Sequence, residues 1–140
     1  MIIAVDFDGT IVEHRYPQIG KEIPFAIATL KKLQKEHHLL ILWSVREGKL
    51  LKEAVEYCRN RGLEFYAVNS NLPEEEQEST SIRSRKVNAD LYIDNRNVGG
   101  LPDWGVIYEL VHRKWSYERY LQEVYDAKRE KTSFWKRIFG

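Results

Sequence analysis

Hydrophobic and polar positions follow two different periods along the first hundred residues. Stretches with apolar residues three or four positions apart predict helices over 24–36 and 48–61, and Gly62 ends the second. Such helices alternate with short apolar runs, an arrangement typical of a parallel sheet with helices on both faces. We therefore expect an α/β fold. The apolar runs predict four buried strands, over residues 2–7, 39–43, 63–68 and 90–94.

The stretch 69–85 has no clear period and is expected to be a long surface connection. Two further helices are expected after it, over 103–113 and from 116 to about 131, with Ser116 as the cap of the second. Tyrosine and aliphatic side chains line one face of that last helix. A tail, 132–140, follows it.

The length of 140 residues fits a single domain over the whole chain. Its core is expected over about 1–113, and a C-terminal helix and tail over about 116–140. No apolar run approaches the length needed to span a membrane, so no membrane insertion is expected. The single cysteine, Cys58, suits a reducing compartment, and a cytoplasmic location is expected. The formal net charge of +1 argues against a design for wrapping nucleic acid.

Polar residues that could bind a ligand or take part in a reaction follow three of the expected strands. Asp6 and Asp8 come at the end of the first strand, Ser44 follows the second, and Asp94 ends the fourth. Ligands of parallel α/β sheets lie beyond the carboxyl ends of the strands. Two acids held close at such an edge repel each other unless a cation lies between them. The pattern therefore predicts a magnesium site beside a carboxylate nucleophile.

The segment Asp6-Phe-Asp-Gly-Thr10 resembles the D-x-D-G-T signature of the haloacid-dehalogenase-like (HAD) phosphohydrolases. The other motifs of that superfamily have counterparts in the same order. The run 39–44 resembles the second motif, Lys86 the third, and the run 91–94 the fourth. The resemblance spans about residues 1–100. It implies a three-layer α/β/α architecture around a Rossmann-like parallel sheet, with extra helices at the C-terminus.

The resemblance also implies a role for each matched residue. Asp6 corresponds to the nucleophile, and Asp8 to the general acid and base. Ser44 and Lys86 correspond to the residues that hold the substrate phosphate. The Mg²⁺ ligands implied are Asp6, the backbone carbonyl of Asp8, and Asp94. The expected function is that of a magnesium-dependent phosphatase acting through an aspartyl-phosphate.

Two nearby residues modify this picture. Asn95 stands where the fourth motif often carries a second acid, so it is expected to orient a metal-bound water without adding charge. Arg46 lies two residues beyond Ser44 and has two interpretations of equal weight. It could bind the substrate phosphate, or it could form a structural ion pair with a loop carboxylate.

The spacing of the motifs leaves no room for a cap domain, since only residues 11–22 separate the first motif from the first helix. A capless protein of this kind would have an open site. The expected substrate is a phosphorylated compound, and a small molecule is favoured over a nucleic acid. Two alternatives stay open: a non-catalytic phosphate-binding or scaffold protein with a vestigial site, and a phosphotransferase to an acceptor other than water.

The tail contains apolar side chains that would be unfavourable in water: Phe134, Trp135, Ile138 and Phe139. They could dock on the chain's own core, be buried between subunits, or contact an anionic surface or nucleic acid. The tyrosine-rich helix before them favours a homo-oligomer formed through this helix and tail.

Overall fold

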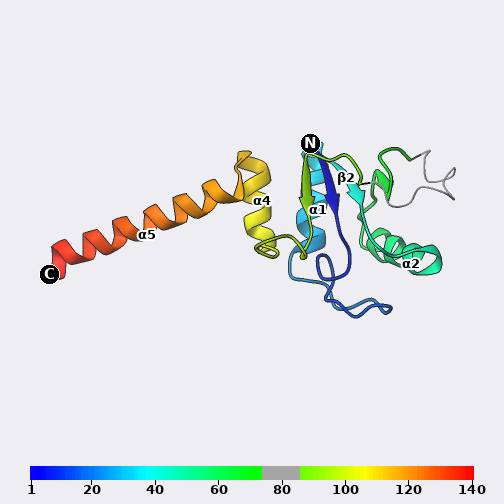
Figure 1. The fold of residues 1–140 in the computed structure, drawn as a ribbon, viewed down its shortest axis with the longest axis horizontal. Coiled ribbons are helices and arrows are strands. Elements are labelled where there is room, and N and C mark those ends of the chain that lie inside the picture. Colours follow the sequence, from blue (N-terminus) through cyan, green and yellow to red (C-terminus); the bar gives the residue numbers. More distant parts are fainter. Residues whose placement is uncertain (74–85) are drawn as a thin grey trace. The chain divides into compact units, whose positions relative to one another are not determined.

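A computed structural model describes residues 1–73 and 86–140 of the chain. These residues form two compact units, Met1–Trp104 and Gly105–Gly140. The first unit contains the sheet, and the second contains most of α4 and all of α5 (Figure 1). Each unit is described by itself below.

The sheet of the first unit has four parallel strands in the order β3-β2-β1-β4. The central strand β1 pairs with β2 along its whole length and with β4 at its carboxyl end. This parallel sheet confirms the α/β fold that the apolar runs predicted. The strands are β1 (Ile2–Val5), β2 (Leu39–Leu42), β3 (Ala67–Val68) and β4 (Leu91–Ile93).

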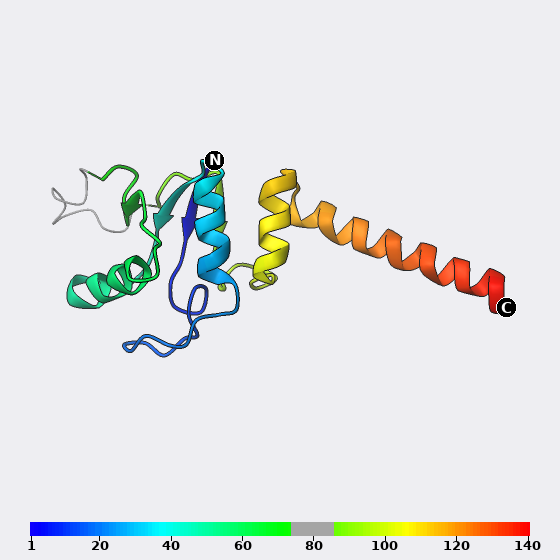
Figure 2. The same ribbon diagram turned by 180° about the vertical axis from the view of Figure 1, so that it is seen from behind.

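Helix α1 (Ala26–Lys35) connects β1 to β2, and α2 (Gly48–Arg59) connects β2 to β3. Both connections move the chain in the same direction across the sheet, so right-handed crossovers place both helices on one face. Figure 2 shows α1 in front of the strands. The Lys31 ammonium donates to the carbonyl of Arg61, 3.2 Å away, and so joins α1 to the segment after α2. Helix α2 ends at Arg59 with Asn60 as its C-cap, two residues before the predicted end, and Gly62, with a φ of 81°, lies in the turn that follows.

The strands of the sheet hold much of the core of the unit. The alternation of a strand directs Ile3, Val5 and Phe7 to one side of β1, and all three are fully buried. Leu40 and Leu42 of β2 pair with Ile3 and Val5 and are fully buried too. Burial of each such side chain contributes roughly 1.5–3 kcal/mol to folding.

The return from β3 to β4 runs in the opposite direction across the sheet and includes residues 74–85, which lie outside the described residues. The surface connection expected over 69–85 falls largely on them.

The third strand is shorter than the predicted 63–68, because β3 covers only Ala67–Val68. It is an edge strand with a partner on one side, β2. Leu63 is fully buried without belonging to the ladder. Its apolar character therefore reflects burial in the turn after α2, where its N–H donates to the Cys58 carbonyl.

The last two helices are α4 (Trp104–Arg113) and α5 (Tyr117–Phe139). Ser116 caps α5 as predicted, because its side chain accepts from the Arg119 N–H at 3.1 Å. The helix continues through the expected tail, since no proline or glycine interrupts it before Gly140. Within the described residues, no helix combines the length and the apolar character needed to cross a membrane.

Candidate functional site

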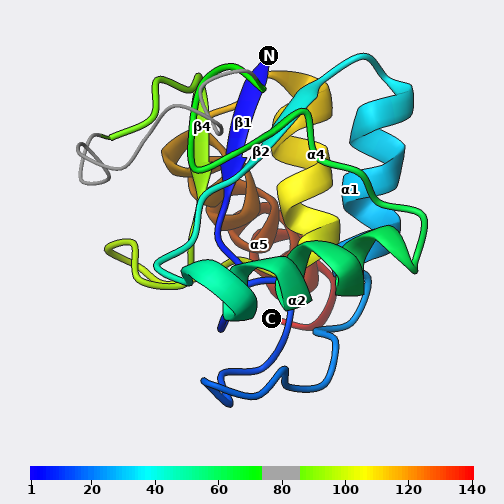
Figure 3. The same cartoon turned by 90° about the vertical axis from the view of Figure 1, so that its right-hand side faces the viewer.

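The register of the central strands brings two acids together at the carboxyl edge of the sheet. Val5 pairs with Ile93, so the next residues, Asp6 and Asp94, continue side by side from β1 and β4. The Asp6 N–H extends the ladder by donating to the Ile93 carbonyl at 3.0 Å. In Figure 3 the strands point toward the segment that follows β1, drawn in blue below them. This placement agrees with the strand-end positions expected from the sequence.

The environment of Asp6 disfavours its negative charge. Burial is the largest cause, and it raises the pKa of Asp6 from an ordinary 3.8 to about 6. The backbone N–H of Phe7 partly offsets this rise, and the charges of Asp94 and then Asp8 add to it. A cation between the carboxylates would relieve the repulsion that these three acids exert on one another.

The side chain of Asp8 is held by Arg46. Arg46 Nε donates to Asp8 Oδ2 at 2.7 Å, and Nη2 donates to Oδ1 at 2.8 Å. This bidentate pair is almost shielded from solvent, with side-chain exposures of 0% for Arg46 and 9% for Asp8. The hydrogen bond with Asp8 raises the pKa of Arg46 above its ordinary value. Of the two interpretations of Arg46, the structure shows an ion pair, and its carboxylate partner is the expected acid and base itself.

The remaining N–H groups of Arg46 bind backbone carbonyls. Nη2 also donates to Gln18 at 2.9 Å, and Nη1 donates to Pro17 at 3.1 Å and more weakly to Leu50 at 3.4 Å. Its guanidinium carbon lies 5.3 Å from the centre of the Tyr16 ring. All five guanidinium N–H groups therefore have acceptors within the chain, and in this conformation none is directed to a substrate.

The turn after Asp8 packs tightly against Asn95. Gly9 has a φ of 81°, and a Cβ added there would lie only 2.8 Å from Asn95 Cγ. The buried Thr10 hydroxyl oxygen accepts from the Asn95 N–H at 3.0 Å. The indole N–H of Trp104 donates to the Thr10 carbonyl at 3.1 Å. Asn95 thus fixes the first motif against the end of β4, next to the metal ligand expected at Asp94.

Ser44 lies beyond β2 and is held on both sides. Its N–H donates to Asn69 Oδ1 at 2.8 Å, and its hydroxyl oxygen accepts from the Arg46 N–H at 3.1 Å. Among the residues that the structure describes, this hydroxyl proton has no acceptor, so it can point toward a ligand. Lys86 takes a different position, with its ammonium 4.4 Å from the centre of the Tyr92 ring. The Lys86 ammonium therefore lies over the ring of a β4 residue.

Sequence reasoning missed Asn69 and Trp104 as parts of this site, and it placed Tyr16 near the site without its contact with Arg46. Asn69 has a detectable signal, because it directly follows the expected third strand and adopts a positive φ of 53°, which asparagine tolerates well. Tyr16 and Trp104 reach the site through contacts across 30 and 94 positions in the sequence. No local pattern reports contacts of that range.

The donors at this edge fit a hard cation such as Mg²⁺. The candidate ligands are the carboxylates of Asp6 and Asp94 and the carbonyl of Asp8, all of which are oxygen atoms. Over residues 1–73 and 86–140, no group of three or more His, Cys, Asp and Glu side chains gathers as a metal cluster. The Asp8 side chain is turned to Arg46, which leaves two carboxylates for a cation.

Fold and site together define an α/β protein whose parallel sheet carries a small acidic site at its carboxyl edge. The chain belongs to the same family as a conserved protein of Bacteroides thetaiotaomicron whose structure is known. The two sequences are 67% identical, with a TM-score of 0.77, over 84% of this chain and 94% of the other. No protein-family model matches the chain, and no curated protein does. This relationship establishes the family and the fold of the chain.

Proposed function

We propose that the chain is a magnesium-dependent phosphatase that hydrolyses a phosphomonoester through an aspartyl-phosphate. The position of Asp6 carries this proposal. It is a partly buried carboxylate at the end of the central strand, beside Asp94, with a pKa of about 6. Such a group is mostly ionised at neutral pH and poorly solvated, as a carboxylate nucleophile should be.

Mg²⁺ would be held by Asp6, Asp94 and the backbone carbonyl of Asp8. When bound, it would supply positive charge that offsets the phosphate oxygens and the crowded carboxylates. Ser44 supports the binding of the phosphate, because its hydroxyl oxygen accepts from the Arg46 N–H and its proton has no acceptor within residues 1–73 and 86–140. Lys86 is exposed and would contribute its ammonium by leaving the Tyr92 ring.

The chemistry uses Asp6 and Asp8 in turn. An Asp6 carboxylate oxygen attacks phosphorus, and the bond from phosphorus to the ester oxygen breaks, with its electron pair passing to that oxygen. Asp8, after leaving Arg46 and taking up a proton from solvent, delivers that proton to the departing oxygen. A water molecule then attacks the aspartyl-phosphate and gives a proton back to Asp8, while the bond between Asp6 and phosphorus breaks. Inorganic phosphate leaves, and both carboxyl groups return to their starting states.

The bond to Arg46 sets a condition on this sequence. Asp8 can transfer a proton only after one of its oxygens leaves the guanidinium, because both oxygens accept from Arg46. When the Asp8 side chain leaves, the positive charge of the fully buried Arg46 guanidinium loses part of its compensation, and this raises the free energy of the protein. We infer that substrate binding has to supply this cost, so that the acid is released when the site is filled.

The proposed substrate is a small phosphorylated compound that binds without a cap. The part of the chain between Thr10 and α1 is short and is tied down by Arg46 at Pro17 and Gln18. The finer architecture of a HAD-like domain, with three layers and no cap, is part of this proposal. It would leave the carboxyl edge of the sheet open to solvent.

A second candidate is a phosphate-binding protein without catalysis. The Asp8–Arg46 pair favours it, because a carboxylate fixed by a buried arginine serves structure well and proton transfer poorly. In that case the chain would bind a phosphorylated ligand at Ser44 and the cation, and would not turn it over.

The test is hydrolysis of an aryl phosphate, with Mg²⁺ and with a chelator, by the wild type, Asp6→Asn and the matched surface variant Asp126→Asn. Turnover that needs Mg²⁺, is lost in Asp6→Asn and is kept in Asp126→Asn would support the phosphatase. Turnover that survives in Asp6→Asn would contradict the covalent mechanism. Phosphate binding without turnover, measured by calorimetry, would favour the second candidate.

A further inference from the structure

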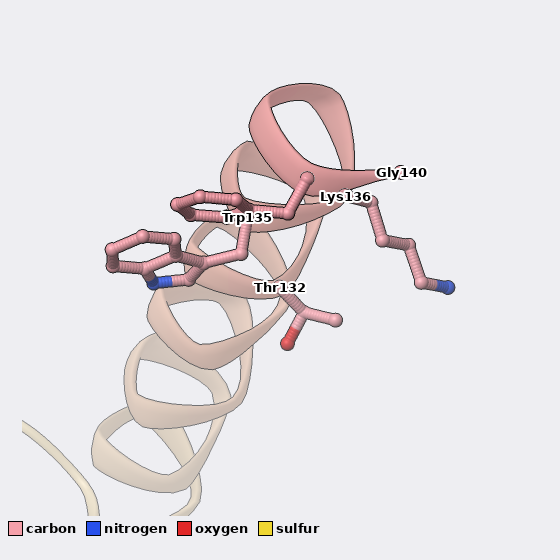
Figure 4. Close-up of a pocket in the computed structure, with 5 residues that line it drawn as sticks. Thr132, Trp135, Lys136 and Gly140 are labelled. Atoms are coloured by element: carbon pink, nitrogen blue, oxygen red, sulfur yellow. The ribbon is translucent and has the colours of Figure 1, made fainter.

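The last two turns of α5 carry an exposed apolar cluster. Phe134, Trp135, Ile138 and Phe139 each expose more than half of their surface, and Phe139 reaches 76%. The rings of Trp135 and Phe139 stack with centroids 5.2 Å apart. Figure 4 shows the Trp135 ring and the Lys136 side chain projecting from different sides of the helix. Contiguous apolar surface of this kind marks an interaction site.

Charge along α5 is divided between its two halves. Residues 117–127 contain three acidic side chains and one basic one, whereas residues 128–140 contain five basic side chains and one acidic one. The apolar cluster lies in the basic half. A partner of this end of the helix should therefore combine negative charge with an apolar phase.

The apolar face of α5 also carries two lysines in its middle. Positions 124, 128, 131, 135 and 138 follow steps of four and three residues and so share one face of the helix. Lys128 and Lys131 occupy this row between Val124 and Trp135. Packing of this face against a second copy would bury both ammonium groups. A layer of anionic headgroups above an apolar phase would instead pair with them.

We propose that the C-terminal half of α5 binds the surface of an anionic lipid bilayer. The four apolar side chains of the cluster enter the boundary between headgroups and acyl chains. Lys128, Lys131 and the other basic residues contact lipid phosphates. The helix lies in the interface instead of crossing it, in the manner of amphipathic helices with aromatic and basic residues. This inference is independent of the chemistry at Asp6.

Co-sedimentation of the full chain with vesicles tests the proposal. Vesicles that contain phosphatidylglycerol should bind the wild type, and vesicles of pure phosphatidylcholine should bind it much more weakly. The double variant Trp135→Ser, Phe139→Ser should lose at least tenfold in binding. Replacement of Lys136 and Arg137 by glutamine should cost about fivefold for each residue. The matched pair Lys49→Gln, Lys52→Gln on α2 removes the same charge and should leave binding unchanged.

Tryptophan emission places the contact on the helix. Emission should shift to the blue when anionic vesicles are added, and Trp135→Phe should abolish most of the shift while keeping the binding, because its ring is still apolar. Circular dichroism of each variant separates loss of binding from loss of folding.

Three results would overturn the proposal. Equal binding to neutral and anionic vesicles would remove the role of charge. Absence of vesicle binding, with a dimer that depends on Trp135 in light scattering, would assign the face to a second copy. Binding of a single-stranded oligonucleotide but not of vesicles would assign the basic half to nucleic acid.

Discussion

Replacement of Asp6 by asparagine should stabilise the metal-free protein at neutral pH. Burial and the neighbouring acids raise the pKa of Asp6 from 3.8 to about 6. Folding at neutral pH therefore moves a charged carboxylate from water into a site that disfavours its charge. A shift of about two units at about 1.4 kcal/mol per unit corresponds to at most about 3 kcal/mol. Asparagine has nearly the same shape and carries no charge, so it removes this cost.

The direction of the Asp6 pKa shift determines the pH range over which Asp6 lowers the stability of the protein. Between about pH 4 and pH 6 the folded protein keeps a proton on Asp6 that the unfolded chain has lost, so the contribution of Asp6 to stability falls as pH rises. Below about pH 4 both states are protonated and the penalty vanishes. The advantage of Asp6→Asn should therefore be largest at pH 7 and close to zero at pH 4.

Urea denaturation of the wild type and Asp6→Asn at these two pH values, with a chelator present, measures the difference. Addition of Mg²⁺ at pH 7 should then stabilise the wild type and leave Asp6→Asn nearly unchanged, because the variant has lost a ligand. An equal or lower stability of Asp6→Asn at pH 7 would refute the reasoning. So would an advantage that does not change with pH.

Three further variants or measurements test the surroundings of the site. Arg46→Met should destabilise the fold by about 3–5 kcal/mol in urea denaturation, because it leaves Asp8 without its partner, and adding Asp8→Asn should recover part of that loss. Gly9→Ala should cost about 1–3 kcal/mol, since φ is 81° and the new Cβ would press on Asn95, whereas Gly105→Ala, with open space around it, should be neutral or stabilising. Burial raises the pKa of the Cys58 thiol to about 12, so iodoacetamide should label it slowly in the native protein at pH 8 and fast in urea; equal rates would contradict its burial.

The strands could be predicted where burial on both sides left a continuous apolar run. β1, β2 and β4 lie within the ranges expected from such runs. The position of β3 could be predicted, but its length could not. Leu63 is apolar because it is buried in the turn after α2, and it does not pair with another strand. The sequence pattern predicts that α5 ends near Lys131, whereas the helix continues to Phe139. Polar residues such as Thr132 interrupt the apolar period there without breaking the helix, and the Thr132 hydroxyl bonds back to the Lys128 carbonyl.

The placement of the acids could be predicted from topology alone. Parallel strands end at one edge, and a register that pairs Val5 with Ile93 makes neighbours of Asp6 and Asp94. The partner of Asp8 could not be predicted in the same way. The Arg46 guanidinium reaches it across 38 positions, and its orientation depends on where the carbonyls of Pro17 and Gln18 lie. Those positions follow from the path of a loop, which has no period to read.

Arg46 places stability and catalysis in opposition at Asp8. The pair joins the first motif, the loop after it and the start of α2, so the fold gains from keeping Asp8 where it is. A proton transfer gains from moving Asp8 away. If the chain is a phosphatase, binding of the substrate therefore has to pay for the opening of a buried ion pair, and weakly bound substrates should turn over slowly even when they reach Asp6. If the chain only binds phosphate, the pair never has to open, and Arg46 is simply the residue that fixes the site.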